Sequence, residues 1–492
     1  MKKILKFYNS YSKLPKSFYE KTIPKPVKDP TLIYVNEDLL NFLNLDAKFM
    51  KSIEAQSVFS GNRIPSGAEP ISLAYAGHQF GHFVPVLGDG RAILLGEIYA
   101  SDKTKKDVQL KGSGQTVFSR NGDGRAPLGA ILREYLISEA LHFLGIPSTR
   151  VLTVVNSGEY IKRQVLTKSG ILTRISSGHV RVGTFEYFAY RKDYKSVRIL
   201  TDYVIKRNFP DIQSSKKKIY NFLHRVMTLQ AKLVAKWTNN GFIHGVINTD
   251  NVLVCGETID YGPCAFMDHY NPQQVYSYID VNGRYSYANQ SKITLWNLSK
   301  LGECLVKIIN DDEKKSVSLI INVLEQYSEK FNSYLLKGLK NKMGMNISKE
   351  GDKKLFNEFL LILYKENVDY TQAFRYLSSI LIDPKNEKKF LFLFRNKSIA
   401  KNWLNKWKNR ILFEKSSPIK ISTKMQLCNP CYIPRNHVVD KAIKLIELKN
   451  DYSLFDQVLT LIKEPFLEKE NGTFLFMPPS KKEKIKNTFC GT

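Results

Sequence analysis

The chain has little cysteine for its length, with 6 among 492 residues at irregular spacing. Small secreted domains held together by disulfides are far denser in cysteine, so that class is excluded and a reduced, cytoplasmic setting is expected. One C-x-x-C pair, Cys428 and Cys431, has no second pair to complete the roughly four ligands of a structural zinc site. Cys490, near the end of a polar tail, is expected to be an exposed thiol.

Long apolar runs are also missing. No uninterrupted apolar stretch approaches the roughly 20 residues that span a bilayer. The N-terminal sequence MKKILKFYNSYSKLPK lacks an apolar segment followed by a small-residue cleavage site. We therefore expect a chain with neither a secretory signal nor a membrane span.

Negative charge is scarce, because 74 Lys and Arg stand against 46 Asp and Glu, a formal net charge of +28. The positive electrostatic field of such a chain attracts nucleic acid, anionic membranes or phosphate-rich ligands. The lysines are scattered, which is more typical of solvated faces, and no zinc-finger, RNP-type or homeodomain pattern accompanies them. Nucleic acid is therefore not the expected partner. The alternative, a non-catalytic protein that binds nucleic acid or membrane through its charge, predicts strongly salt-sensitive binding.

Three segments of the chain differ in composition and in predicted secondary structure. Residues 1–70 are interrupted by proline and predict an extended N-terminal wrapping segment with one short helix around NEDLLNFLNL. Residues 71–185 read as strands around one helix that starts at Pro127. Residues 186–492 are mainly amphipathic helices. The strand pieces are FVPVL, RAILLGEIYA, DVQLKG, TRVLTVV, YIKRQVL and GILTRIS, and the apolar stripe of the helix is Leu128, Ile131, Leu132, Tyr135, Leu136 and Phe143.

An acidic residue is missing where a phosphotransferase needs one. In HGVINTDN, residues 244–251, Asn251 stands where a kinase catalytic loop, H-R-D-L-x-x-x-N, has its metal-binding Asn, but Val246 replaces the Asp. Asp250 is the only carboxylate in the loop and could serve as a base from a shifted position. A shifted base suggests a shifted reacting phosphate. His244 is interpreted as a structural loop residue.

The segment NVLVCGETIDYG, residues 251–262, reads as two short strands around a Cys-Gly turn. Such a hairpin would bring Asn251 and Asp260 to one end, where their oxygens could share one Mg²⁺ or Mn²⁺. Asp260, Tyr261 and Gly262 stand where a kinase has Asp-Phe-Gly. With the order of strands and helices, these motifs predict an α+β, two-lobed, protein-kinase-like fold with a strand-rich N-lobe and a largely helical C-lobe.

Nucleotide chemistry also needs groups that hold phosphates. Lys111 ends an alternating strand and Glu134 lies in the next helix, the order in which kinases pair these residues. Gly88 and Gly90 in LGDGRA could let backbone N–H groups approach a phosphate, although a plain hairpin turn is the alternative. In NGDGRAPLG, residues 121–129, the loop before the helix could also bind an anion through Asp123 and Gly124.

Arginines add to these candidates. Arg174 and Arg181 stand seven residues apart around a glycine-containing turn, and Arg91 follows the first glycine turn. Several arginines near one site suggest a polyphosphate held by bidentate contacts. Independent surface arginines are the alternative.

Long motifs give the chain a specific resemblance. They are YAGHQFGHFVPVLGDGRA, QLKGSGQTVFSRNGDGRAPLGAILREYLISEAL, RISSGHVRVGTFE, HGVINTDN and TIDYGPCAFMD, in this order. Over nearly its whole length the chain resembles selenoprotein O, a family of protein adenylyltransferases with a pseudokinase fold. The resemblance implies that ATP binds in a flipped orientation and that AMP is transferred to Ser, Thr or Tyr hydroxyls of protein substrates, with release of pyrophosphate.

The resemblance also implies roles for particular residues. Asp250 would accept the proton, Asn251 and Asp260 would hold Mg²⁺ or Mn²⁺, and Glu134 would partner Lys111. The ATP-binding residues would be Gly88, Gly90, Arg91, Lys111, Asp123, Gly124, Arg174, Arg181 and Asp260. The rival is a conventional kinase that transfers the γ-phosphate, against which Val246 argues.

One position departs from the family pattern. Family members commonly carry a tail Cys or selenocysteine that can pair with a Cys after an FMD-x-Y-x-P stretch. This chain continues FMDHYNP with QQVYSYID, so Tyr276 stands at the usual partner position of Cys490. The resemblance therefore does not extend to a regulatory disulfide.

Overall fold

The computed structural model describes residues 5–485 and 487–488. Within this part of the chain, eight strands form one antiparallel sheet in the order β1, β3, β6, β7, β10, β9, β2, with β8 paired to β10. Two smaller antiparallel pairs lie apart from it, β4 with β5 and β11 with β12. The strands are β1 (Tyr19–Lys21), β2 (Thr31–Val35), β3 (Ile71–Leu73), β4 (Gly77–Gln79), β5 (His82–Val84), β6 (Ala92–Tyr99), β7 (Lys105–Lys111), β8 (Ala126–Pro127), β9 (Arg150–Lys162), β10 (Leu166–Ser176), β11 (Phe242–Ile243) and β12 (Ala265–Phe266).

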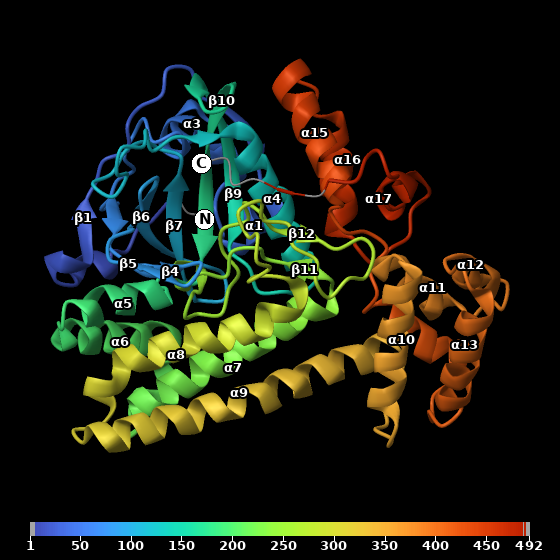
Figure 1. Cartoon of the computed structure of the whole chain (residues 1–492). Coiled ribbons are helices and arrows are strands. Elements are labelled where there is room, and N and C mark those ends of the chain that lie inside the picture. Colours follow the sequence, from blue (N-terminus) through green and yellow to red (C-terminus); the bar gives the residue numbers. More distant parts are fainter. Residues whose placement is uncertain (1–4, 486, 489–492) are drawn as a thin grey trace.

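The helices fall into an N-terminal group, a central group and a C-terminal group (Figure 1). They are α1 (Glu37–Phe42), α2 (Ala47–Met50), α3 (Ile53–Phe59), α4 (Leu128–Phe143), α5 (Val182–Tyr190), α6 (Tyr194–Asn208), α7 (Lys218–Asn239), α8 (Gln290–Ile309), α9 (Glu313–Lys342), α10 (Asp352–Glu366), α11 (Tyr370–Ser379), α12 (Asn386–Phe392), α13 (Lys397–Ile411), α14 (Pro418–Gln426), α15 (Asn436–Lys449), α16 (Ser453–Lys463) and α17 (Thr473–Phe476). The chain is thus strand-rich in its first part and helical in its C-terminal part, as the sequence predicts.

The first 70 residues contribute more structure than their proline content indicates. They provide both edge strands of the large sheet, β1 and β2, and three short helices instead of the one expected. Asn36, Asp46 and Ser52 cap these helices by accepting hydrogen bonds from backbone N–H groups. Helices of four to seven residues are too short to form a periodic apolar pattern, which explains why α2 and α3 were not predicted.

The helix α4 begins at Leu128, one residue after the predicted start, because Pro127 is its N-cap residue, and the helix buries more than the predicted stripe. One side packs on the large sheet, and α15 and α16 from the far end of the chain pack on the other (Figure 1). Phe455 of α16 contacts the ring of Tyr135, for example. Because two layers cover α4, polar residues such as Glu134 and Glu139 are also buried in it.

The central helices lie beneath the sheet and share its largest core (Figure 1). The long helix α9 packs along α7 and α8 and then reaches the helices α10 to α14, which build a separate core around Phe359, Trp403 and Trp407. No helix in the described part of the chain is long and apolar enough to cross a bilayer.

Two local predictions are wrong. Residues 251–262 do not form a hairpin, because the residues on either side of the Cys255–Gly256 turn pair with different segments: Leu253 bridges Arg181, and Thr258 bridges Ser148. The piece YIKRQVL is not a separate strand, since it spans the turn at 163–165 that joins β9 to β10. In both cases β-branched composition predicts extended backbone but cannot identify its partner.

Candidate active site

A cavity of about 850 Å³ lies between the large sheet and the loop that carries HGVINTDN. The glycine turn before β6, the ends of β7 and β10, the helix α4 and the loops around residues 246–251 and 260–263 form its walls. Each residue predicted to bind or to react lines this cavity. They are Gly88, Gly90, Arg91, Lys111, Asp123, Gly124, Arg174, Arg181, Asp250, Asn251 and Asp260.

Four charged side chains, hereafter the charged cluster, satisfy one another on the cavity wall. Lys111 Nζ donates to Glu134 Oε2 at 2.6 Å and to Asp260 Oδ1 at 3.0 Å. Arg174 Nη2 donates to Glu134 Oε1 at 2.6 Å and to Asp260 Oδ1 at 2.9 Å. The Lys111–Glu134 pair expected from the sequence is therefore formed, and Arg174 joins it. The cluster holds two positive and two negative groups in close contact.

Electrostatics keep both carboxylates of the charged cluster ionised. Burial alone would raise the pKa of Glu134, but the charges of Arg174 and Lys111 hold that pKa below its usual value. Burial would also raise the pKa of Asp260, and Lys111, Arg174 and Arg181 hold it well below its usual value. Asp260 has a left-handed backbone with φ of 62°, a conformation that Asp tolerates better than most residues.

Strand register explains how the cluster forms. Arg174 on β10 is the direct partner of Gln109 on β7, and Lys111 follows two residues after Gln109. Since side chains alternate along a strand, all three point to the same face of the sheet. Arg174 Nη1 donates to Gln109 Oε1 at 3.2 Å, which fixes the guanidinium from behind.

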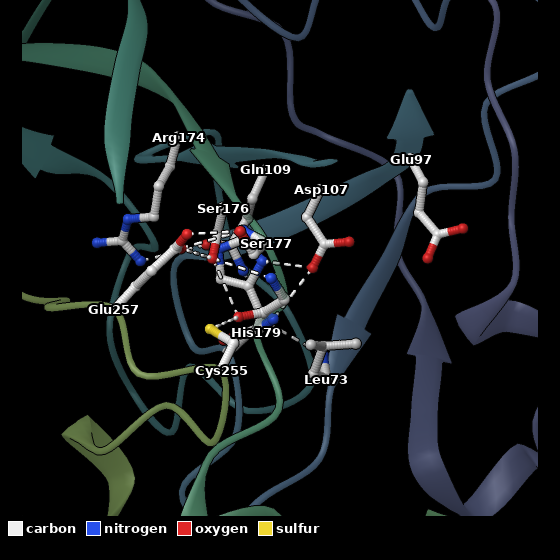
Figure 2. Close-up of polar contacts among 12 residues, drawn as sticks. Leu73, Glu97, Asp107, Gln109, Arg174, Ser176, Ser177, His179, Cys255 and Glu257 are labelled. Carbon is white, nitrogen blue, oxygen red and sulfur yellow. Dashed lines mark hydrogen bonds and ion pairs between the residues drawn. The ribbon is translucent and has the colours of Figure 1, made fainter. Parts of the chain in front are cut away.

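A buried polar network that was not predicted from the sequence lies behind this wall. Asp89, between the two glycines of LGDGRA, accepts hydrogen bonds from Gln109 Nε2 at 3.1 Å and from Leu73 N at 3.2 Å, and it lies 3.8 Å from Arg181 Nη2. Figure 2 shows Gln109 and Asp107 on β7, with Arg174 to one side and His179 below them in the view. His179 Nδ1 lies 2.8 Å from Asp107 Oδ2. The network ties the glycine turn to both arginines.

The glycine turn is not the plain hairpin that the sequence left open, because β5 pairs with β4 while β6 pairs with β3 and β7. Gly88 has φ of 66°, and a Cβ atom there would lie 2.1 Å from the ring of Phe118. At Gly124, with φ of 68°, a Cβ would lie 2.1 Å from the backbone of Gly114. Only glycine allows these close approaches at positive φ.

The catalytic loop presents a carboxylate with few partners. Asp250 is 8% exposed, and its Oδ2 accepts one hydrogen bond from Gln79 Nε2 at 3.1 Å. Its Oδ1 is buried without a hydrogen-bond partner among the described residues. Burial raises the pKa of Asp250 to about 6, against the opposing effects of Gln79 and Arg181. A carboxylate of this kind is ionised at neutral pH and is a better base than an exposed one.

Asn251 and Asp260 both carry an oxygen suited to a hard cation. Asn251 Nδ2 donates to the carbonyl of Val246 at 3.0 Å, so the amide oxygen is the atom left for a metal. Asp260 uses Oδ1 for Lys111 and Arg174, and no described residue donates to its Oδ2. Among the described residues no group of three or more His, Cys, Asp or Glu could hold a metal alone. Two protein oxygens suit Mg²⁺, which usually completes its shell with water and phosphate.

His244 has the structural role that the sequence indicates. Its ring is buried, Nε2 lies 2.8 Å from the carbonyl of Ile259, and burial lowers its pKa. This contact holds the catalytic loop to the residue before Asp260.

The tail approaches the cavity near Tyr276. Thr488 N donates to the carbonyl of Tyr276 at 2.8 Å, and Thr488 forms a β-bridge with Ser277. The tyrosine is buried. Cys490 lies outside the described residues. Cys428 and Cys431 are both free thiols.

Comparisons with known proteins identify the family of the chain. Residues 2–463 match the family model described as protein adenylyltransferase SelO. The chain belongs to the SelO family. It is 44% identical over 486 residues to the protein nucleotidyltransferase YdiU of Rhodopseudomonas palustris strain HaA2, covering 99% of each chain. It is 44% identical over 486 residues to the YdiU of Rhizobium etli, covering 99% of this chain and 97% of that one.

Membership of this family makes the chain a nucleotidyltransferase that adenylylates protein, with ATP as its substrate. It favours nucleotidyl transfer over the rival reading of a kinase that transfers the γ-phosphate. Sequence reasoning missed three polar residues beside the cavity, namely Gln79, Asp89 and Gln109. Their only signal was their position in the quoted motifs. Gln79 and Asp89 lie in YAGHQFGHFVPVLGDGRA, and Gln109 is the first residue of QLKGSGQTVFSRNGDGRAPLGAILREYLISEAL.

Proposed function

We propose that this SelO-family enzyme transfers AMP from ATP to Ser, Thr or Tyr hydroxyls of protein substrates and releases pyrophosphate. One observation carries the proposal: the sparsely bonded carboxylate of Asp250 lies in the same cavity as the charged cluster and Arg181. A proton acceptor and a set of phosphate-binding cations are therefore available to one bound nucleotide.

The fold that supports this chemistry is a two-lobed, kinase-like one in our proposal. Residues 1–70 wrap the N-lobe, residues 71–185 form the N-lobe with its nucleotide loops, and residues 186–492 form the helical C-lobe with the catalytic and metal loops. The division is supported by the change from the antiparallel sheet to the central helices, even though α15 and α16 return to pack on α4. The free thiols of Cys255, Cys304, Cys428 and Cys431 favour a reducing compartment such as the cytoplasm.

The phosphates are held mainly by cationic side chains. Lys111 and Arg174 keep fixed positions through Glu134, while Arg181 is held by the carbonyl of Asp250 at 3.0 Å and by stacking on Tyr75. Rigid cations of this kind stabilise charge that develops on phosphate oxygens during the reaction. Arg91 and the backbone at Gly88, Gly90, Asp123 and Gly124 complete the nucleotide-binding set.

Asn251 Oδ1 and Asp260 Oδ2 would hold Mg²⁺ or Mn²⁺ against the phosphates. When bound, the cation neutralises phosphate charge and aligns the reacting phosphoryl group.

The acceptor hydroxyl loses its proton to the Asp250 carboxylate as its oxygen bonds to the α-phosphorus. The bond between the α-phosphorus and the oxygen that bridges to the β-phosphate breaks, and pyrophosphate leaves with that electron pair. Val246, in place of the usual kinase Asp, leaves Asp250 as the carboxylate of this loop that can act as base.

The test supplies ATP labelled at either the α- or the γ-phosphate to purified enzyme, Mg²⁺ or Mn²⁺ and a cell extract. We expect label in protein only from the α-position, on hydroxyl side chains. Protein labelled only from the γ-position would reverse the assignment and reinstate the kinase alternative.

A further inference from the structure

The hairpin of β4 and β5 contacts the catalytic loop with three consecutive residues. His78 N donates to Thr249 Oγ1 at 2.6 Å, Gln79 Nε2 donates to Asp250 Oδ2 at 3.1 Å, and Phe80 N donates to Asn248 Oδ1 at 3.2 Å. These contacts join residues 168 to 171 positions apart in the chain. The hairpin is therefore a brace for the loop, because one hairpin residue donates to each of three loop residues: His78 and Phe80 through the backbone and Gln79 through its side chain.

The brace is itself anchored on the opposite side. His78 Nδ1 lies 2.5 Å from Glu186 Oε1 of α5, and Ala76 N donates to the carbonyl of Gly183 at 2.9 Å. The His78 ring meets Trp296 of α8 edge to face at 5.1 Å. Two central helices thus hold the hairpin, and the position of Gln79 is defined by the fold rather than by a free loop.

The approach of the hairpin to Asp250 is close. A Cβ atom on Gly77 would lie 3.0 Å from both Cβ and Oδ1 of Asp250. The backbone of Gly77 therefore packs against one carboxylate oxygen, while the Gln79 amide binds the other. No other side chain in the described part of the chain donates a hydrogen bond to this carboxylate.

We propose that Gln79 is a positioning residue for the reaction: its amide fixes the plane of the Asp250 carboxylate, and Gly77 leaves the space that this orientation needs. The inference rests on the proposed role of Asp250 as proton acceptor. Gln79 does not take the proton. It determines how often the carboxylate points toward the acceptor hydroxyl, so its effect falls on the rate of transfer and not on nucleotide affinity.

The test compares Gln79→Met, which keeps the side-chain length but removes the amide, with the unaltered enzyme. Since a misplacement of about 1 Å at a reacting group can cost roughly 100-fold, we expect kcat to fall by about 10- to 100-fold. The dissociation constant for ATP should change by less than about twofold. Gly77→Ala, which pushes on the carboxylate from the other side, should lower kcat in the same way. Thermal unfolding of each variant shows whether the fold is intact.

A double-mutant cycle separates positioning from a merely structural role. In an Asp250→Asn background, Gln79→Met should cause little further loss, because the group that it positions is already inactive. His82→Ala, at the exposed position paired with Gln79 across the hairpin, is the control and should retain full activity.

Two results would count against these roles, and they are distinguishable. If Asp250→Asn alone keeps the full rate, the proposed base is wrong, whatever Gln79 does. If Asp250→Asn is impaired, three results for Gln79→Met would show that Gln79 is not the positioning residue. They are full activity, weaker ATP binding in place of a lower kcat, and a further multiplicative loss of rate in the Asp250→Asn background.

Discussion

Two groups of side chains in one cavity differ in how completely their charges are satisfied. The charged cluster of Lys111, Glu134, Arg174 and Asp260 pairs each cation with two carboxylates at 2.6 to 3.0 Å. Asp250 has one donor on Oδ2 and none on Oδ1 among the described residues. The pKa shifts follow the same division, because the pKa of Asp260 is lowered and that of Asp250 is raised to about 6.

In our proposal this difference corresponds to separate tasks for the two groups. Cations that carboxylates hold in fixed positions can bind phosphates without rearranging during the reaction. A carboxylate with unused acceptor capacity can take a proton. We therefore propose that the charged cluster binds the nucleotide and that Asp250 takes part in the reaction. Asp260 belongs to the cluster through Oδ1 and would hold the metal through Oδ2.

Asp260→Ala should have the largest effect, because it removes a carboxylate from the cluster and a proposed metal ligand at once. We expect transfer of AMP to fall below detection while the fold remains intact. The measurement is incorporation of α-labelled ATP into protein, with far-UV circular dichroism as the control for folding. Full activity with an unchanged metal requirement would contradict the assignment.

Asp250→Asn should reduce the rate of transfer by on the order of 100- to 10,000-fold, the usual contribution of a general base. ATP binding should be retained, since the charged cluster is untouched. Single-turnover kinetics at saturating ATP would measure the loss. An unaffected rate would remove Asp250 from the mechanism and erase the contrast between the two groups.

Glu134→Gln should act mainly on affinity. It leaves Lys111 and Arg174 with Asp260 as their one remaining carboxylate partner in the cluster, so their positions should loosen. We expect the dissociation constant for ATP to rise by about tenfold, together with some loss of stability from the broken buried pairs. Equilibrium binding of ATP checks this. Unchanged affinity would mean that the cluster does not hold the phosphates.

Lys342, at the end of α9, extends the comparison to a cation outside the cavity. It is buried beside the rings of Tyr370 and Phe374, and no described carboxylate pairs with it. Burial lowers its pKa to about 7, against the opposing effect of the neighbouring Cys428. Between about pH 7 and 10.5 the unfolded chain holds this proton and the folded chain does not, so stability due to Lys342 rises with pH.

Lys342→Met should therefore leave transfer unchanged and raise the melting temperature at pH 7, by on the order of 2–5 °C. This rise in melting temperature should become smaller as the pH approaches 10, because the folded chain then holds Lys342 uncharged and burying it no longer destabilises the fold. Thermal unfolding at both pH values is the measurement. An equal gain at both would show that packing, and not charge, is responsible.

The sequence predicts those parts of the site that depend on short motifs and on the order of strands and helices along the chain. Lys111 at the end of a strand, Glu134 in the following helix and the loops around Asp250 and Asp260 all follow from motif and periodicity. It predicts the existence of the long helices for the same reason. It does not predict that α15 and α16 cover α4, because their partners lie some 300 residues away in the chain.

Residues whose function depends on tertiary partners were missed. Gln79 reaches Asp250 only because α5 and α8 anchor its hairpin, and Asp89 reaches Gln109 only through the pairing of neighbouring strands. The hairpin expected at 251–262 failed for a related reason. Leu253 and Thr258 do form β-bridges, but residues 147–149 and 180–182 provide the pairing partners.

The central claim is that the charged cluster binds while Asp250 reacts. The most direct test measures ATP affinity and the single-turnover rate at saturating ATP side by side for Glu134→Gln and Asp250→Asn. We predict a crossed pattern: weaker binding with a smaller loss of rate for the first, and retained binding with a loss of at least about 100-fold for the second. If both variants change affinity and rate in the same proportion, the two groups do not have separate tasks.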